Sequence, residues 1–223
     1  MDMQTIQVYA PYLYFDKNEP FFPVRVGVTV FEQEGVSPSF RRSFPFNDIR
    51  LKKIIEYAIY WDYDIQHLYE LEHVWVYIGH DGNVIDCEAS FHGKYLKGLL
   101  KDRSNLLDGT HVRLFSQPGK HAFSPVAEFL ELVPHFMTAV NEDAGVDGLT
   151  IPYFLEGTIM TNEETNKLVE TYLKSCAFTP ALVYKEYRLD EELFVPWFKL
   201  LKEIPERIQT KIADLTELYG KKS

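Results

Sequence analysis

The segment Val74-Trp-Val-Tyr-Ile-Gly-His-Asp-Gly-Asn83 decides the fold class of this 223-residue chain. The side chains of its first five residues alternate between two faces, and Val74, Val76 and Ile78 share one of them, as is typical of a β-strand. His80-Asp81-Gly82 fits a three-residue hairpin loop with Gly82 in the left-handed region. Similar β-branched and aromatic runs recur from Ile6 to about Val126, for example over residues 24–31 and 112–115.

Other segments have helical spacing of their apolar residues. Between the strands, residues 48–60 are predicted to form a short helix behind an Asn47 or Asp48 cap. After Pro125 the pattern becomes helical throughout. There we expect helices over residues 126–140, behind a capping box made by Thr161 and Glu164, and from Pro205 to Gly220.

These patterns predict an α+β, mainly β protein: an antiparallel β-sandwich core with C-terminal helices packed on it. We expect one domain over residues 1–223, with the sandwich in residues 1–125 and a helical extension in residues 126–223. The length suits one core with appendages, because two well-filled domains would need a longer chain.

The charge and cysteine content exclude some classes of partner. The chain has 33 acidic and 23 basic residues, a net charge of -10, which argues against nucleic acid or an anionic bilayer as the main partner. Two cysteines make no disulfide framework, and neither a signal-peptide pattern nor a membrane-spanning apolar run is present. We therefore expect a cytoplasmic protein without a transmembrane segment.

Chemistry-bearing side chains concentrate just before the strand quoted above, where His67, Glu70 and Glu72 have the spacing His-x-x-Glu-x-Glu. On a helix the three could not converge, but on a strand Glu70 and Glu72 share a face and His67 lies on the entering turn. Two carboxylates on one rim repel each other, and a divalent cation is the simplest remedy. The spacing therefore suggests a metal site, with a solvated rim as the alternative.

Two further histidines lie within reach of this site in the predicted topology. A three-residue loop at His80-Asp81-Gly82 places Glu72 opposite Ser90 and Glu70 opposite His92, whereas a two-residue turn would move His92 to the other face. His121 is presented at a strand end by the Pro118-Gly119 turn, although a lone loop histidine more often makes a backbone hydrogen bond.

Several segments together resemble the Vps62-like family. They are Tyr9-Ala-Pro-Tyr-Leu-Tyr-Phe-Asp-Lys-Asn-Glu-Pro-Phe-Phe-Pro-Val24, Tyr60-Trp61 followed by Glu70-Leu-Glu-His-Val-Trp-Val76, Ser90-Phe-His-Gly93 and Gly119-Lys-His-Ala122. The first three site residues also resemble the His-x-x-Asp-x-Glu motif of the related necrosis-inducing NPP1-type proteins. That resemblance implies a β-sandwich over roughly residues 9–125 and a divalent metal bound by His67, Glu70 and Glu72. It also implies Asp62 or Asp64 as a possible fourth ligand, with His92 nearby and His121 entering the metal site from a separate strand end.

The departures from the toxin motif are specific. Glu70 stands where that family has Asp, Leu71 stands where it has Trp, and no signal peptide or disulfide pair is evident. Secreted toxin activity is therefore not expected. The resemblance to the toxins does not extend to the helical residues after Pro125.

Three functions fit these observations. The first is a metal-binding sandwich that recognises a small polar ligand, such as a sugar or lipid headgroup, through open positions on the ion. Carboxylate ligands favour Mg, Ca or Mn, whereas two histidines with one carboxylate would favour Zn. The second is a metal-dependent hydrolase. The ion would activate a bound water molecule, and Glu70 or His92 would act as the general base. The third is a structural site, at which a bound cation only holds a strand end in place.

Overall fold

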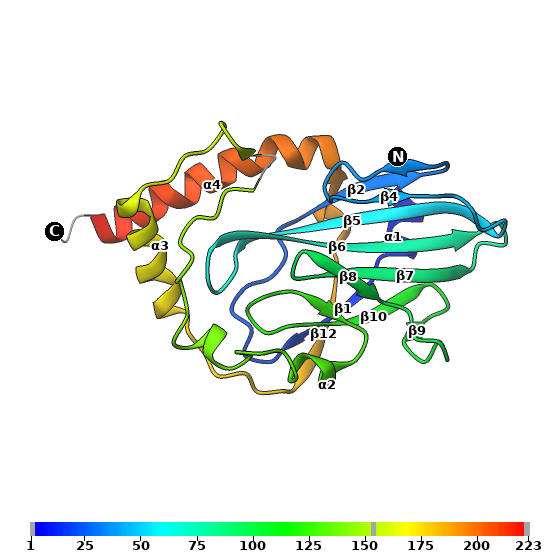
Figure 1. Cartoon of the computed structure of the whole chain (residues 1–223), viewed down its shortest axis with the longest axis horizontal. Helices are drawn as coiled ribbons and strands as arrows, with labels where there is room; N and C mark the ends of the chain where they lie inside the picture. The colour runs from blue at the N-terminus through cyan, green and yellow to red at the C-terminus, as the bar shows by residue number, and fades with distance from the viewer. Residues whose placement is uncertain (1–2, 153–154, 221–223) are drawn as a thin grey trace.

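The computed structural model describes residues 3–152 and 155–220, and most of its regular structure is two β-sheets (Figure 1). The five-stranded sheet has the order β11-β10-β1-β12, with β9 paired to β10, and the six-stranded sheet has the order β13-β2-β5-β6-β7-β8. The first contains β1 (Tyr12–Asp16), β9 (Leu106–Leu107), β10 (His111–Ser116), β11 (Phe123–Ser124) and β12 (Tyr184–Arg188). The second contains β2 (Arg25–Phe31), β5 (Leu51–Tyr63), β6 (Leu68–Gly79), β7 (Val84–Phe91), β8 (Lys94–Lys97) and β13 (Phe194–Pro196).

The remaining elements lie outside these sheets. Figure 1 shows α3 (Glu163–Ser175) and the C-terminal end of α4 (Trp197–Tyr219) at the left of the molecule, opposite the β6–β7 end of the six-stranded sheet. A two-stranded ribbon pairs β3 (Gly35–Val36) with β4 (Ser43–Phe44). The α-helices are α1 (Met3–Val8), α2 (Ala127–Leu130), α3 (Glu163–Ser175) and α4 (Trp197–Tyr219), and short 3-10 helices span Thr138–Val140 and Glu191–Leu193.

The predicted fold class is confirmed, because one apolar core joins the inner faces of both sheets and the C-terminal helix packs on the strands. Most strand pairs are antiparallel, as expected, but β1 pairs with β10 and β13 pairs with β2 in parallel. The core includes Leu13 and Phe15 from β1, Leu114 from β10, and Val74 and Val76 from β6.

The predicted helix over residues 48–60 is wrong, since this segment forms most of β5. The side chains from Ile54 to Trp61 are all buried, so both faces of the strand are covered. A strand buried on both faces carries an unbroken apolar run without period-two alternation, and such a run is readily mistaken for a helix. Phe44 and Trp75 cover the outer face at Ile54.

The helix predicted over residues 126–140 is also largely wrong. Only α2 and the 3-10 turn Thr138–Val140 form there, and Pro134 interrupts the segment, because proline lacks the amide donor that a continuing helix needs. Two residues of the expected apolar stripe, Phe129 and Leu132, are exposed. Helix α3 does form, but its N-cap is Asn162, whose side chain accepts a hydrogen bond from Thr165 N at 2.8 Å.

Helix α4 begins eight residues before the predicted start at Pro205, which lies in its interior. Trp197, Leu200, Ile204 and Ile208 make one buried stripe through the proline, so tertiary packing offsets the lost backbone hydrogen bond. A Cβ atom at Gly27 of β2 would lie 2.8 Å from Trp197 and 2.9 Å from Leu200. The helix therefore rests directly on the backbone of β2.

The segment after Pro125 contributes strands as well as helices, which the sequence pattern missed. Strand β12 pairs with β1 in the first sheet, and β13 pairs with β2 in the second. Among the described residues, no helix combines the length and the apolar character that crossing a membrane requires.

The packing of α4 on β2 gives a stability prediction. Leu200→Ala removes a fully buried side chain and should lower the free energy of unfolding by about 2 to 5 kcal/mol. Phe198→Ala, two residues earlier and 66% exposed, should change it by less than about 0.5 kcal/mol. Urea unfolding of both variants measures the difference, and equal losses would contradict the docked position of α4.

Candidate functional site

The candidate site lies at the turn between β5 and β6, the two longest strands. Tyr63 pairs with Leu68, and Asp64 N donates to His67 O at 2.9 Å, so residues 64–67 close the hairpin. Asp64 Oδ1 accepts a hydrogen bond from Gln66 N at 2.7 Å, which fixes the carboxylate inside the turn. A hairpin turn thus positions the ligand-capable groups of the site.

Three side chains converge here: Asp64, His67 and Glu70 each offer one ligand atom, and these atoms lie within 4.8 Å of one another. His67 Nε2 is 3.8 Å from Asp64 Oδ1 and 3.5 Å from Glu70 Oε2. Asp64 is fully buried, whereas the side chains of His67 and Glu70 are 16% and 20% exposed. Asp64 therefore lies at the buried bottom of the group, and His67 and Glu70 lie at its partly exposed edge.

A lysine that the motif analysis did not consider enters the same site. Lys120 Nζ lies 2.7 Å from Asp64 Oδ1, and its side chain is only 11% exposed. Burial alone lowers the pKa of Lys120, but Asp64 and Glu70 outweigh it and raise the pKa above the usual value. Lys120 lies in the segment Gly119-Lys-His-Ala122, in which His121, and not Lys120, was the candidate site residue.

The Asp64 carboxylate is held in its charged form. Burial raises its pKa, but His67, Lys120 and His121 together outweigh burial and lower the pKa below its usual value. Its second oxygen, Oδ2, is buried and has no hydrogen-bond partner among the described residues, which is uncommon for a carboxylate oxygen.

Glu72 lies next to this group and behaves differently. It is buried, and its carboxylate accepts a hydrogen bond from the Ser90 hydroxyl. Burial first, and then the charge of Glu70, raises the pKa of Glu72 well above its usual value. Glu72 therefore favours the protonated state and lies outside the three converging residues.

The hairpin that was to bring His92 opposite Glu70 has the predicted loop but a different register. Gly82 is left-handed with φ 80°, and Gly79 N donates to Asn83 O at 2.8 Å, as expected. A bulge between Tyr77 and Ile78 then shifts β7 by one residue, so that Tyr77 pairs with Asp86. The predicted pairing of Glu72 with Ser90 and Glu70 with His92 is therefore wrong.

His92 occupies a hairpin turn of its own. With Gly93 it forms the two-residue turn between β7 and β8, and both residues have positive φ, 49° and 73°. Its Nε2 lies 2.7 Å from Gln117 Oε1. His92 is not among the three converging residues.

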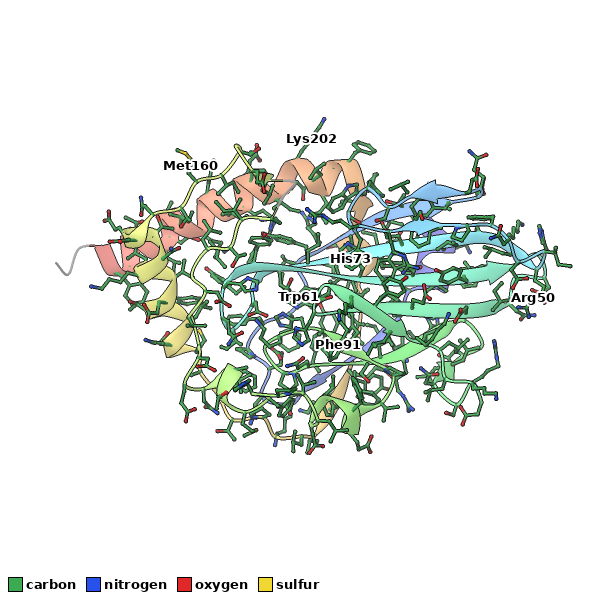
Figure 2. The ribbon with its side chains drawn as sticks, viewed as in Figure 1. Arg50, Trp61, His73, Phe91, Met160 and Lys202 are labelled. Atoms are coloured by element: carbon green, nitrogen blue, oxygen red, sulfur yellow. The ribbon has the colours of Figure 1, made fainter. Side chains whose placement is uncertain are left out.

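His121 is fully buried and held by partners other than the three converging residues. Its ring stacks on Trp61 with centroids 4.5 Å apart, and its Nε2 lies 3.4 Å from Glu19 Oε1. Glu19 Oε2 also accepts a hydrogen bond from Gly119 N at 2.8 Å. Figure 2 labels Trp61 near the middle of the molecule. The stack on Trp61 and the contacts with Glu19 hold the loop that carries Lys120.

Of the two aspartates named as a possible fourth ligand, Asp62 has a separate partner. Arg207 of α4 makes two hydrogen bonds to it, Nε to Oδ1 and Nη2 to Oδ2, both 2.9 Å. This ion pair ties the end of β5 to the C-terminal helix. Asp64 is the aspartate that joins His67 and Glu70.

A second buried polar cluster covers the outer face of the six-stranded sheet. Glu56 accepts hydrogen bonds from Ser37 Oγ at 2.6 Å, Ser39 Oγ at 2.8 Å and Trp75 Nε1 at 2.7 Å. His73 Nε2 lies 3.0 Å from Ser39 Oγ. Because the Ser39 proton goes to Glu56, His73 donates to Ser39 and cannot act as its base, so the cluster is no serine triad.

Comparison with known proteins gives a distant structural likeness. No family model matches the chain, and no curated protein matches it. Similar solved structures include "NLPPya in complex with glucosamine" and "NLPPya in complex with mannosamine", 18% and 19% identical. Each has a TM-score of 0.36 and covers 54% of this chain, and the match spans 64% of the other chain.

Another similar structure is titled "Toxin fold for microbial attack and plant defense". It is 15% identical with a TM-score of 0.36, covering 55% of this chain and 68% of that one. The solved structures thus belong to the necrosis-inducing group named from the motif. The resemblance to the Vps62-like family stays a prediction, because no family model matches the chain.

The raised pKa of Glu72 predicts how its neutral analogue behaves. Below the ordinary pKa of 4.5, Glu72 is protonated in both the folded and the unfolded chain. At higher pH Glu72 releases its proton only in the unfolded chain, which stabilises the unfolded state and so lowers the free energy of unfolding. Glu72→Gln should therefore raise the melting temperature at about pH 8 and leave it unchanged at about pH 4.

Glu88→Gln is the matched control for that experiment. Burial raises the pKa of Glu88, but hydrogen bonds from Tyr77 and Arg42 outweigh it and lower the pKa. Its neutral analogue should therefore lower the melting temperature at about pH 8. A lower melting temperature for both variants would contradict a protonated Glu72.

A second pH prediction concerns His73, whose pKa burial and then Arg42 lower from 6.5 to about 3. The folded chain keeps His73 neutral, so its contribution to stability is complete above pH 6.5 and is lost as the pH falls toward 3. Across that window the wild type should lose about 1.4 kcal/mol per pH unit more than His73→Gln. Urea unfolding at several pH values measures this, and parallel profiles would contradict it.

Proposed function

We propose that this protein binds a divalent metal ion through Asp64, His67 and Glu70 and uses an open position on the ion to recognise a small polar ligand. The observation that carries the proposal is the convergence of these three side chains, whose ligand atoms lie within 4.8 Å of one another around a fully buried carboxylate. His67 Nε2 lies 3.8 Å from Asp64 Oδ1 and 3.5 Å from Glu70 Oε2. A cation among these atoms would offset the repulsion of the two carboxylates and the cost of burying Asp64.

The donor set fits a divalent ion. Two carboxylates favour Mg, Ca or Mn, and the imidazole of His67 adds affinity for Mn or Zn. Because three ligands converge among the residues that the structure describes and two of them are partly exposed, water or a ligand would complete the coordination shell. Such an ion would supply a fixed positive charge at the rim of the site.

A polar hollow beside the turn offers room for the ligand. It has a volume of about 300 Å³ and is lined by residues that include Asp147, Gly148, Glu163 and Asn166. Gly148 forms a backbone bridge with His67, so the hollow adjoins the turn that carries the proposed site. Its lining of carboxylates, the Asn166 amide and the Lys167 ammonium suits a ligand rich in hydroxyl or amine groups, such as a sugar or a lipid headgroup, and its volume limits the ligand to a small one.

Asp64→Asn tests the metal proposal. The amide keeps the size of the side chain but loses its charge, so the affinity for Mn²⁺ should fall at least about tenfold. Isothermal titration of the chelator-stripped full chain measures it. The control is His73→Gln, which changes a residue of the other polar cluster and should bind Mn²⁺ as the wild type does. Equal Mn²⁺ affinity in Asp64→Asn and the wild type would refute the site.

The ligand is tested separately on the loaded protein. We expect chemical-shift changes at Asp147 and Gly148 when monosaccharides, amino sugars or soluble lipid headgroups are added with a diamagnetic ion such as Ca²⁺. The changes should disappear when a chelator is present. Ligand-induced changes that persist in the chelator would leave the hollow as a binding site independent of the ion.

A further inference from the structure

The site already holds a positive charge of its own. Lys120 Nζ contacts Asp64 Oδ1 at 2.7 Å, in the same group where His67 Nε2 lies 3.8 Å from that oxygen. Together Asp64 and Glu70 carry two negative charges, and the ammonium neutralises one. A divalent ion among these ligands would lie close to a like charge in a poorly solvated place, where repulsion is strong.

We propose that Lys120 is a resident competitor for the metal ion, whose ammonium must leave Asp64 before a divalent cation binds, so that Lys120 sets the metal affinity. This inference rests on the proposed function, since it describes the regulation of that same site. It makes the site selective for conditions in which the divalent ion is abundant.

The backbone at Lys120 is held in place, so a displacement of its ammonium would involve the side chain alone. The backbone is fixed by hydrogen bonds from Lys120 N and His121 N to Gln117 O, at 3.1 and 2.9 Å. On one side Gly119 N donates to Glu19, and on the other the His121 ring stacks on Trp61. Exchange of the ion for the ammonium therefore requires a rotamer change and no rearrangement of the loop.

The neighbouring hollow can accept the displaced ammonium. Asp147, which lines the hollow, is a further carboxylate whose charge acts on Lys120 and raises its pKa. Glu163, Glu170 and Lys167 line the same hollow. Its three carboxylates outnumber its one ammonium, so a lysine that rotates away from Asp64 toward the hollow keeps a counter-charge.

The first experiment removes the ammonium and keeps the length of the side chain. Lys120→Met should bind Mn²⁺ at least about tenfold more tightly than the wild type when the stripped full chain is titrated with the metal alone. Lys97→Met is the matched control, because Lys97, like Lys120, pairs with carboxylates, here Asp86 and Glu88 on another part of the surface. It loses the same charge and should leave the affinity unchanged.

A second experiment uses the wild-type chain and so does not depend on the folding of a variant. Acetylation by an amine-reactive ester should be slow at Lys120, which is 11% exposed, and at least about fivefold faster when Mn²⁺ saturates the protein. Lys97, which is 64% exposed, should react at the same rate with and without the ion. Mass spectrometry of peptides measures both rates.

The outcomes separate this inference from the proposed function. If wild type and Lys120→Met bind Mn²⁺ with equal affinity, or the variant binds more weakly, the metal site stands and the competitor role is overturned. If Mn²⁺ binds while acetylation of Lys120 stays slow, the competitor role is again overturned. If neither protein binds Mn²⁺, both proposals fail, and Lys120 is simply the structural counter-ion of Asp64.

Discussion

The pairing of β5 with β6 is the interaction on which the rest of the structure depends. These strands pair from Leu51 with Gly79 to Tyr63 with Leu68, and β5 is buried along most of its length. A strand covered on both faces must find partners for each of its apolar side chains. The five-stranded sheet and helix α4 cover one face of this hairpin, and the β3–β4 ribbon contributes Phe44 to the other.

The same constraint explains why charged groups gather at one end of the hairpin. Asp62 is among the last residues of β5, and Asp64 lies in the turn that follows. Neither can reach bulk water freely, so each has a cation brought from elsewhere in the chain: Arg207 from α4 and Lys120 from the loop after β10. Buried charges are retained where they are paired, and here the pairs also fasten distant segments to the hairpin.

Much of the fold could be predicted from local patterns, and the errors have physical causes. The strand from Val74 to Ile78 and the left-handed Gly82 follow from alternation and turn chemistry. The bulge between Tyr77 and Ile78 leaves no mark in composition, and it moves the pairing by one residue. The double burial of β5 removes the alternation that identifies a strand.

The candidate site was predicted in part for similar reasons. His67 and Glu70 could be identified because their spacing within one turn and strand is local. Lys120 and Glu19 could not, because their roles arise from contacts across 56 and 102 residues of chain. A motif of histidines and carboxylates identifies candidate metal ligands, and it does not identify the positively charged Lys120 that pairs with one of them.

The two strands contributed by the last part of the chain bear on the order in which the protein folds. Strand β1 pairs with β12, and β2 pairs with β13, so both sheets have an unfilled edge until residue 196 has left the ribosome. Contacts of such wide sequence separation slow folding, and open sheet edges favour association between chains. Synthesis of this protein therefore includes a long interval in which a nascent chain with most of its strands made depends on dilution or chaperones to stay unassociated.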